Sequence, residues 1–444
     1  MLNLTDKFIE NLFKLKISDE IYSKAELCLI DYIGVTYVGA KNNKYILDKF
    51  DNLLGYNGSA TIINSESLKS NAVMGAFING FNAHTMELDD GHRFGMIHLG
   101  AVIISALLAV AESENISYRC MLKGIIIGYE AATRLALAMQ PGHKKKGYHT
   151  TGTCGTIGAA LGCAFAMNYD INQIKCVLSA ATTSASGLLE IQENASQLKA
   201  YNVAHAAASG VMAFYMGKLN LKGPDDILGA KKGMLSVFSD TVNENFLIQN
   251  SNNFEIERIY VKPYAACRHC HSAIEASITL RNEYNIPIEE IDKIEVYTYE
   301  LAIKGHNHIN IQGMNSAKLS IPYSVAVAYI NKNCGLDEFT DKYLLDRDVL
   351  KLTELVEVIE KKEYTQLSPS KRIAEVIITT KDGLKYKKCV EYAKGEPENA
   401  MSVDEIKSKF INNMKWCDKE EQGKILINLL SNKNLVMNDL FKNI

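Results

Sequence analysis

A segment near residue 90 concentrates side chains that can accept and donate protons. HTMELDDGHRFGMIHLG, residues 84–100, contains three histidines and three carboxylates between two apolar stretches. Histidine and carboxylate groups commonly carry general acid–base catalysis, and loops held by rigid elements commonly carry function. The alternative interpretation is structural, with Asp89 or Asp90 capping the next element and the histidines facing solvent.

Two further segments place a titratable residue beside the start of an expected helix. In GYHTTGTCGTIGAALG, residues 147–162, His149 precedes a turn rich in threonine and glycine. The N–H groups and the dipole at such a helix start suit a carboxylate or phosphate, although a simple N-cap explains each threonine alone. The phosphate-binding pattern G-x-x-x-x-G-K-[ST] is absent from the sequence. Lys199 precedes another apolar helix and could equally be a solvated lysine.

The fourth segment, VKPYAACRHCHSAIEA at residues 261–276, brings basic residues to a turn between an expected strand and helix. It contains C-x-x-C-H, a pattern of haem attachment, but such attachment accompanies export and we expect no signal peptide here. A zinc site would need a second ligand pair, for which the nearest candidates are His306 and His308. The interpretation that remains is an anion site formed by Lys262 and Arg268.

Composition restricts the class of protein. The 444 residues are 47% hydrophobic and 22% charged, which is typical of a globular chain. The 48 basic and 51 acidic residues give a net charge of −3, without a long run of like charge, so we expect no nucleic-acid partner. The longest apolar run, Leu99–Ala111, is shorter than the roughly 20 residues that span a bilayer. We therefore expect no membrane partner and a cytoplasmic location.

Taken together, the four segments suit acid–base chemistry on a small acidic molecule. Cationic side chains would hold carboxylates, a base would remove a proton bound to carbon, and an acid would protonate a leaving group. The segments contain no metal cage and no nucleotide fingerprint, and the chain has no G-x-S-x-G nucleophile motif. We expect no metal.

Helices are expected to position the first three segments. Apolar stretches with helical spacing continue to about residue 250, and Thr5 is expected to cap the first. Several are rich in glycine, alanine and serine, which allows close packing in a large bundle. Near residue 254 the pattern changes, because FEIERIYVKPY and IDKIEVYTYE alternate like strands. AEVIITTKDGLKYKKCVEY predicts a hairpin that turns at Asp382-Gly383.

Further helices are expected over Ser272–Glu283, Ile321–Ile330 and Arg347–Lys361, and Ser402 with Glu405 predicts a capping box. The predicted fold class is mostly α: a large all-helical domain with an inserted smaller α+β lid domain. The expected domains are residues 1–253 (helical, first part), 254–396 (α+β lid) and 397–444 (helical completion).

Four motifs in order resemble the 2-methylcitrate dehydratase family, MmgE/PrpD. They are NGFNAHTMELDDGH with a later histidine and glycine, GYHTTGTCGTIGAA, KPYAACRHCHSAIEA and LSIPYSVAVA. The resemblance extends over essentially the whole chain. It implies a helical domain and an α+β lid with the active site between them, a homodimer, and catalysis with no iron–sulfur cluster or organic cofactor.

By position, the resemblance implies a set of catalytic residues: Asp90, His98, His149, Lys199, Lys262 and Tyr323. The expected substrate-binding residues are His92, Thr151, Arg268 and His271. The sequence departs from the family at Leu99, where many members have proline, and at Asn202, where many have histidine. Cys267 stands where cis-aconitate decarboxylases have a histidine, which disfavours a decarboxylase.

The favoured hypothesis is a hydro-lyase acting on a 2-methylcitrate- or citrate-like tricarboxylate. Lys199, Lys262 and Arg268 would bind carboxylates, Asp90 or a neutral histidine would take the α-proton, and another histidine would help hydroxide to leave. A cis-aconitate decarboxylase and an iminodisuccinate-type epimerase use similar groups and remain alternatives. A non-catalytic protein that binds small di- or tricarboxylates is the alternative from another class.

Overall fold

The computed structural model describes residues 2–50, 52, 58–65, 68–192, 196, 198–249 and 253–442. The protein is mostly helical with a small mixed sheet in its C-terminal region, which confirms the predicted fold class. Contacts divide the chain into two units. Unit 1 comprises Met1–Gln192, Leu198–Tyr260 and Ser402–Ile444, and unit 2 comprises mainly Val261–Met401. The expected domains, residues 1–253, 254–396 and 397–444, stay a prediction.

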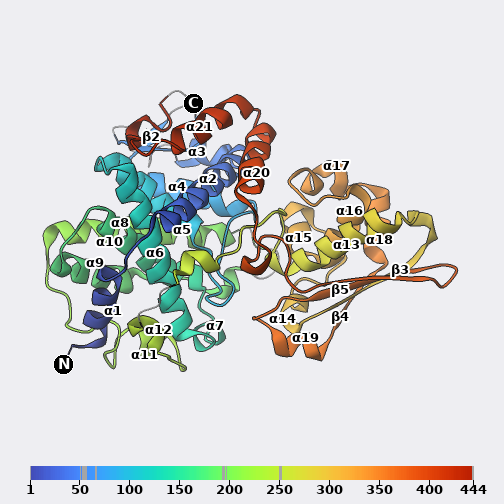
Figure 1. Ribbon diagram of the computed structural model, residues 1–444, viewed down its shortest axis with the longest axis horizontal. Coiled ribbons are helices and arrows are strands. Elements are labelled where there is room, and N and C mark those ends of the chain that lie inside the picture. Colours follow the sequence, from blue (N-terminus) through green and yellow to red (C-terminus); the bar gives the residue numbers. More distant parts are fainter. Residues whose placement is uncertain are drawn as a thin grey trace. The chain divides into compact units, whose positions relative to one another are not determined.

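Unit 1 is built almost entirely from helices (Figure 1). Its helices are α1 (Leu4–Phe13), α2 (Asp19–Asn42), α3 (Tyr45–Phe50), α4 (Ala72–Thr85), α5 (Gly100–Ser113), α6 (Tyr118–Met139), α7 (Gly142–Lys145), α8 (Thr150–Ala166), α9 (Ile171–Ser184), α10 (Lys199–Leu219), α11 (Met234–Phe238), α12 (Asn245–Ile248), α20 (Val403–Trp416) and α21 (Glu420–Leu430). The short strands β1 (Ala60–Thr61) and β2 (Lys69–Ser70) pair antiparallel.

Glycines allow α6 and α8 to approach backbone to backbone in the centre of unit 1. A Cβ atom on Gly128 would lie 2.8 Å from the carbonyl oxygen of Gly158, and one on Gly158 would lie 2.7 Å from the carbonyl oxygen of Gly128. Helix α8 also packs on α10, and α10 packs on α4. The small-residue stretches seen in the sequence therefore form the buried centre of the bundle, and the first residues of α5 and α8 are buried there.

Two expected caps have different outcomes. Ser402 and Glu405 form the predicted capping box at the start of α20. The prediction for Thr5 is wrong, because Asn3 caps α1 and accepts from the backbone N–H of Asp6. The Thr5 hydroxyl instead donates to the carboxylate of Asp226 at 2.7 Å. A distant partner thus replaces the local role that the sequence suggested.

Unit 2 contains a four-stranded sheet in the order β4-β3-β5-β6. The strands are β3 (Ile291–Thr298), β4 (Val356–Glu360), β5 (Ala374–Thr380) and β6 (Lys385–Val390); β3 runs parallel to β4, and the other neighbours are antiparallel (Figure 1). The predicted hairpin turning at Asp382-Gly383 is confirmed as β5–β6. The helices are α13 (His271–Tyr284), α14 (Glu300–Ile303), α15 (Gly313–Leu319), α16 (Ile321–Asn331), α17 (Asp341–Leu344), α18 (Arg347–Glu354) and α19 (Lys362–Leu367).

One strand prediction and one helix prediction need correction. FEIERIYVKPY does not form a strand: it begins with a 3₁₀ helix, η3 (Glu255–Arg258), and only Tyr260 makes an isolated bridge, with Gly91. The expected helix Arg347–Lys361 ends at Glu354, after which the alternating residues VEVIE form β4. In both places long-range partners decide the backbone conformation. The backbone N–H of Glu255, for example, donates to Glu130.

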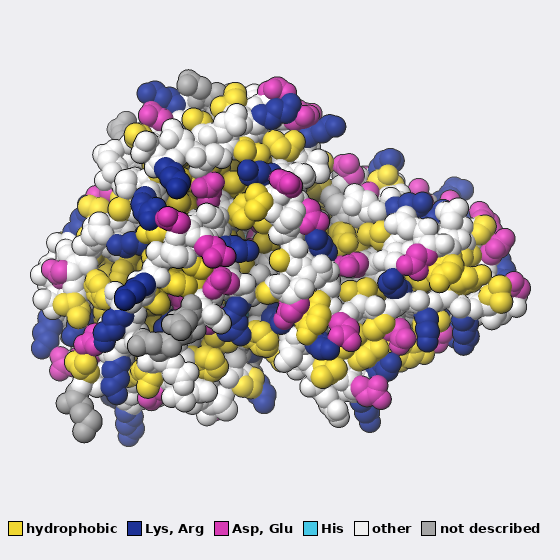
Figure 2. Space-filling model, viewed as in Figure 1, with side chains coloured by type: hydrophobic (Ala, Val, Ile, Leu, Met, Phe, Trp, Pro, Cys, Tyr) yellow, Lys and Arg dark blue, Asp and Glu magenta, His cyan; other side chains and the backbone are white. Residues whose placement is uncertain are grey.

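Charged side chains of both signs are interspersed over the face drawn in Figure 2. This distribution agrees with the small net charge of −3. Across the described residues, none of the helices has the length and apolarity needed to cross a bilayer.

Candidate active site

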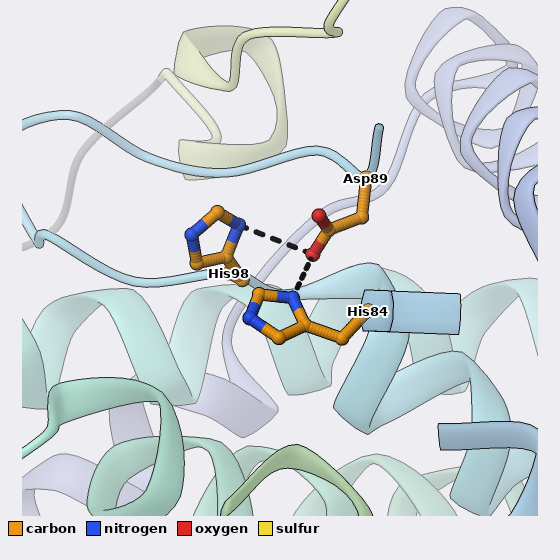
Figure 3. A group of neighbouring side chains, drawn as sticks. All are labelled: His84, Asp89 and His98. Atoms are coloured by element: carbon orange, nitrogen blue, oxygen red, sulfur yellow. Dashed lines mark hydrogen bonds and ion pairs between the residues drawn. The ribbon is translucent and has the colours of Figure 1, made fainter. Parts of the chain in front are cut away.

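In unit 1 one carboxylate joins two histidine rings (Figure 3). Oδ2 of Asp89 lies 2.8 Å from Nδ1 of His84, near the end of α4, and 3.1 Å from Nδ1 of His98, just before α5. Nδ1 of His98 also lies 2.9 Å from the backbone oxygen of Asp90. A carbonyl oxygen only accepts, so Nδ1 of His98 carries the hydrogen. In the neutral ring, Nε2 then presents its lone pair.

The two rings on Asp89 differ in their access to solvent. The side chain of His98 is 16% exposed, whereas that of His84 is 1% exposed. Burial lowers the pKa of His84 below its ordinary value, and the charge of Asp89 opposes this effect. Among the described residues, Nε2 of His84 has no hydrogen-bond partner. His98 is therefore the better placed of the two to meet a ligand.

His149 is held in the opposite tautomer. Nδ2 of Asn202 lies 3.0 Å from Nδ1 of His149 and also donates to the carbonyl oxygen of Leu188 at 3.3 Å. The contact with a carbonyl fixes the amide orientation, because only the nitrogen of an amide can donate to it. The amide therefore donates to Nδ1 of His149, and the neutral ring carries its hydrogen on Nε2.

Electrostatics keep His149 neutral. Burial lowers its pKa well below the ordinary value, and the nearby His84, Lys199 and His98 lower it further, while Glu87 acts in the opposite direction. An imidazolium at this position would also bring two donors together at Nδ1, because Asn202 already donates there. The site thus offers a lone pair at Nε2 of His98 and an N–H donor at Nε2 of His149.

An ion pair between Lys199 and Glu87 adds a positive group beside these rings. Lys199 begins α10, and its Nζ donates to Oε1 of Glu87, two residues beyond the end of α4. The two side chains are 19% and 10% exposed. Glu87 has a φ of 53°, the left-handed region that a residue with a side chain seldom adopts. The loop adopts this costly conformation where it places the carboxylate on Lys199, and such outliers often mark functional sites.

Asp90 lies beside this group but is engaged in the fold. Its Oδ1 accepts from the backbone N–H of Gly100 at 2.8 Å, and its Oδ2 accepts from the hydroxyl of Tyr129 at 2.6 Å. Burial raises the pKa of Asp90 to about 6, although both hydrogen bonds act against the shift. The carboxylate of Asp90 thus ties the loop to α5 and α6, whereas its neighbour Asp89 contacts the histidines. Of the two bases expected, Asp90 or a neutral histidine, these contacts favour the histidine, and the catalytic role of Asp90 stays a prediction.

A buried lysine from the C-terminal part of unit 1 supports the same loop. Nζ of Lys409 on α20 lies 2.6 Å from Oδ1 of Asp31 and donates to the carbonyl oxygen of Leu88 at 3.0 Å. Both side chains of the ion pair are less than 10% exposed. The segment after residue 402 thus helps to fix the backbone immediately before Asp89.

Replacing Lys409 with methionine should destabilise the protein by about 3–5 kcal/mol, because it leaves Asp31 charged and buried without this partner. The free energy of unfolding in urea measures the effect. Lys415→Met on the same helix is the matched control, since Lys415 is exposed, and it should change stability by less than about 0.5 kcal/mol. Equal stabilities of the two variants would contradict the anchoring role.

Two residues expected to bind substrate instead hold the loop. His92 is fully buried; its Nδ1 accepts from the backbone N–H of Gly95 at 3.0 Å, and its Nε2 lies 3.1 Å from Glu255. Both ring nitrogens are thus engaged, and we assign His92 a structural role. Thr151, at the start of α8, is buried and its hydroxyl oxygen accepts from the backbone N–H of His98 at 3.1 Å. Thr151 therefore positions His98.

In unit 2 one of the two cations of the expected anion site, Arg268, is paired with a carboxylate of the same unit. Nε of Arg268 lies 2.9 Å from Glu396, and one Nη donates to Nδ1 of His271 at 2.8 Å. Nε2 of His271 donates to the carbonyl oxygen of Ala266 at 3.1 Å. Arg268 and His271 are both buried. These contacts hold both side chains within unit 2, and their role in binding a substrate carboxylate stays a prediction.

The other two expected residues of unit 2 are also fully buried. The hydroxyl of Tyr323 on α16 donates to the backbone oxygen of Glu338 at 2.7 Å. This bond holds the Tyr323 hydroxyl in place, and the catalytic role of Tyr323 stays a prediction. Lys262 lies near the beginning of the Val261–Met401 segment of unit 2 and is buried. Its catalytic assignment stays a proposal.

His84, Asp89 and His98 are also spaced as metal ligands, with ligand atoms within 4.8 Å of one another. The bond from Nδ1 of His98 to the Asp90 carbonyl places a hydrogen on that nitrogen, so only Nε2 of this ring could coordinate a metal. Lys199 adds a positive charge that disfavours a cation. We therefore interpret the three residues as a hydrogen-bonded group.

Sequence reasoning missed Glu87, Asp89 and Asn202 as members of the site. Glu87 and Asp89 lie inside the segment that was singled out, but two adjacent aspartates cannot be told apart without the fold. Asn202 was visible only as a departure from the family pattern. Of the expected residues, the structure brings His98, His149, Lys199 and Thr151 together in unit 1.

Two imidazoles held in opposite tautomers beside a lysine form a group that is suited to acid–base chemistry. Residues 5–246 match the MmgE/PrpD N-terminal domain, and residues 264–433 match the MmgE/PrpD C-terminal domain. The chain therefore belongs to the MmgE/PrpD family, as the motifs predicted.

Curated relatives are similar over most of the chain. Human cis-aconitate decarboxylase is 21% identical over 453 residues, which cover 96% of this chain and 92% of the human protein. The mouse cis-aconitate decarboxylase is 21% identical over 425 residues, which cover 92% of this chain and 86% of the mouse protein. A cis-aconitate decarboxylase-like protein of Aspergillus oryzae, oryM, is 23% identical over 68% of this chain and 66% of its own length.

Proposed function

We propose that this protein is a cofactor-independent hydro-lyase that dehydrates a 2-methylcitrate- or citrate-like tricarboxylate. The observation that supports this reaction most strongly is the pair Asp89–His98, which leaves the lone pair of His98 Nε2 available. Dehydration begins with removal of a proton α to a carboxylate and needs such a base. Decarboxylation begins with loss of CO₂ and needs a proton donor instead.

In the proposed reaction, Nε2 of His98 takes the α-proton while Asp89 stabilises the imidazolium that forms. The electron pair of the C–H bond moves into an enolate whose charge lies on a carboxylate oxygen. His149, neutral and with its hydrogen on Nε2, donates a hydrogen bond to that oxygen, and Lys199 contributes positive charge. The C–O bond then breaks to form the alkene, and the His98 imidazolium returns its proton to the departing hydroxyl, which leaves as water.

Lys262 of unit 2 keeps its proposed catalytic role, as a buried cation that stabilises substrate carboxylates. Lys262→Ala should reduce turnover at least about 100-fold, which steady-state kinetics can measure. Near-normal turnover in a folded Lys262→Ala protein would remove this residue from the mechanism.

We also propose that the protein forms a homodimer. Analytical ultracentrifugation tests this, because it measures the mass of the particle in solution.

Proton NMR in deuterated water tests the reaction, with 2-methylcitrate, citrate, cis-aconitate and iminodisuccinate as separate substrates. We expect loss of water from one of the first two compounds, with a new alkene signal, and deuterium at the α-carbon of recovered substrate. Inversion of iminodisuccinate would indicate an epimerase instead. Thermal stabilisation by these acids with no turnover would indicate a binding protein.

The second candidate function is decarboxylation of cis-aconitate, which the names of the three curated relatives favour. The same experiment separates it, because the decarboxylase would consume cis-aconitate, release CO₂ and leave 2-methylcitrate and citrate unchanged. In that case a protonated His98 would supply the proton that the carbanion takes up.

A further inference from the structure

A thiol and an imidazole form a pair in unit 2 that the proposed dehydration does not use. Sγ of Cys267 lies 3.3 Å from Nε2 of His306. Cys267 is the residue before the 3₁₀ helix η4 (Arg268–Cys270), and its backbone N–H donates to the carbonyl oxygen of Lys318 at 2.8 Å. Both Cys267 and His306 are partly exposed. The thiol is thus held by its backbone and remains reachable for a small reagent.

The second nitrogen of His306 fixes the direction of proton transfer. Nδ1 of His306 lies 2.7 Å from the backbone oxygen of Lys304. The carbonyl oxygen only accepts, so Nδ1 carries the hydrogen and Nε2 points its lone pair at the thiol. A nucleophile, a base within hydrogen-bond reach and a group that orients the base together define an activated nucleophile.

The described groups around the pair have hydrogen-bond or ion-pair partners of their own. His269 lies with its ring centroid 5.2 Å from that of His306, and its Nδ1 is 2.6 Å from the hydroxyl of Tyr299. Burial raises the pKa of Tyr299, so its hydroxyl stays neutral. Arg268, the next residue in the chain, is paired with Glu396. Arg372 acts to lower the pKa of Tyr299, whereas Cys267, Glu396 and Cys270 act to raise it further.

We propose that Cys267, activated by His306, is a nucleophilic thiol site that adds to alkenes conjugated to a carbonyl group. The thiol gives its proton to Nε2 of His306 as sulfur bonds to the β-carbon of the alkene. The π electrons move to the α-carbon, which takes the proton back from His306. The product is a thioether, and no oxidant, leaving group or further reactant is required.

Labelling of the full-length protein with N-ethylmaleimide at pH 6.5, followed by mass spectrometry of each cysteine peptide, tests the proposal. Cys389 is the internal reference because it is exposed and its neighbour is a tyrosine hydroxyl instead of a histidine. Its Sγ lies 3.7 Å from the hydroxyl of Tyr364. An ordinary thiol with a pKa near 8.5 is about 1% ionised at this pH. We expect Cys267 to react at least about fivefold faster than Cys389, after allowance for the weaker nucleophilicity of a thiolate of lower pKa.

Two matched variants identify the base. His306→Gln should slow labelling of Cys267 by about fivefold or more and leave Cys389 unchanged. His308→Gln is the same substitution in the same loop, but His308 bonds to Ser316, so the rate at Cys267 should be normal. Labelling of Cys267 no faster than Cys389, or an equal loss of rate in both variants, would overturn the proposal. Neither readout depends on turnover, so the proposed dehydration can fail independently.

Discussion

Replacing His98 with glutamine should lower kcat by about 10²–10⁴-fold while KM changes little, because the α-proton then has no base. Glutamine keeps a polar group of similar length but has no lone pair on a basic nitrogen. Steady-state rates measure the loss, and exchange of the substrate α-proton with deuterated water should disappear together with turnover.

Asp89→Asn tests the contribution of the carboxylate in the Asp89–His98 pair. An amide carries no charge to stabilise the His98 imidazolium, so kcat should again fall, by about 10²-fold or more. His205→Gln on α10 is the control: its ring is half-buried, lies 3.4 Å from the hydroxyl of Ser186, and takes no part in the mechanism. Normal proton exchange in a folded His98→Gln protein would assign the base elsewhere.

Asn202→Asp should be the second substitution with a large effect, because it reverses the tautomer of His149. A carboxylate can only accept, so Nδ1 of His149 would carry the hydrogen and Nε2 would lose it. The hydrogen bond to the enolate would be lost, and holding a catalytic histidine in the wrong tautomer can cost up to about 10⁴ in rate. We expect a loss in kcat of about 10²–10⁴-fold.

The pH dependence gives Asn202→Asp a signature that a simple packing defect lacks. In the wild type the pKa of His149 is well below its ordinary value, so this residue is neutral throughout the pH range of an assay. A carboxylate at position 202 would raise that pKa and bring a titration of His149 into the range. ¹⁵N NMR of the histidine rings should show this titration in the variant, and Asn202→Ala is the control in which no charge is introduced.

The lowered pKa of His149 predicts how the free energy of unfolding changes with pH. His149 has a lower pKa folded than unfolded, so the unfolded chain binds the extra proton. The contribution of His149 to the free energy of unfolding is therefore intact above the unfolded pKa of about 6.5, and it is lost as the pH falls below that value. Between pH 7.5 and 5, wild type should lose more unfolding free energy than Asn202→Asp. An equal loss would mean that His149 does not titrate on unfolding.

Asp90 and Arg268 illustrate how hydrogen bonds and ion pairs between distant residues decide where a charged side chain is held. Both were expected to contact substrate, yet Asp90 accepts from Tyr129, 39 residues away, and Arg268 pairs with Glu396, 128 residues away. Lys199 meets Glu87 across 112 residues. A residue type at a family position indicates that a charge is present there. Its partner decides whether that charge faces a ligand.

The sequence by itself determined the features that depend on near neighbours. Apolar spacing and small residues predicted the helical bundle, Asp382-Gly383 predicted the β5–β6 hairpin, and Ser402 with Glu405 predicted a capping box. Turns, caps and periodic burial are set by residues a few positions apart, so they can be read locally. Four motifs in order also predicted the MmgE/PrpD family, which the domain matches confirm.

Only the tertiary structure decided which nitrogen of each ring carries a hydrogen. The tautomer of His149 follows from Asn202 and Leu188, and that of His98 follows from the backbone of Asp90. FEIERIYVKPY had a strand pattern but formed η3, held by Glu130 and His92. Hydrogen-bond direction and burial depend on groups that the packing of separate helices brings together. These partners are distant in the sequence, so the residues around each histidine do not identify them.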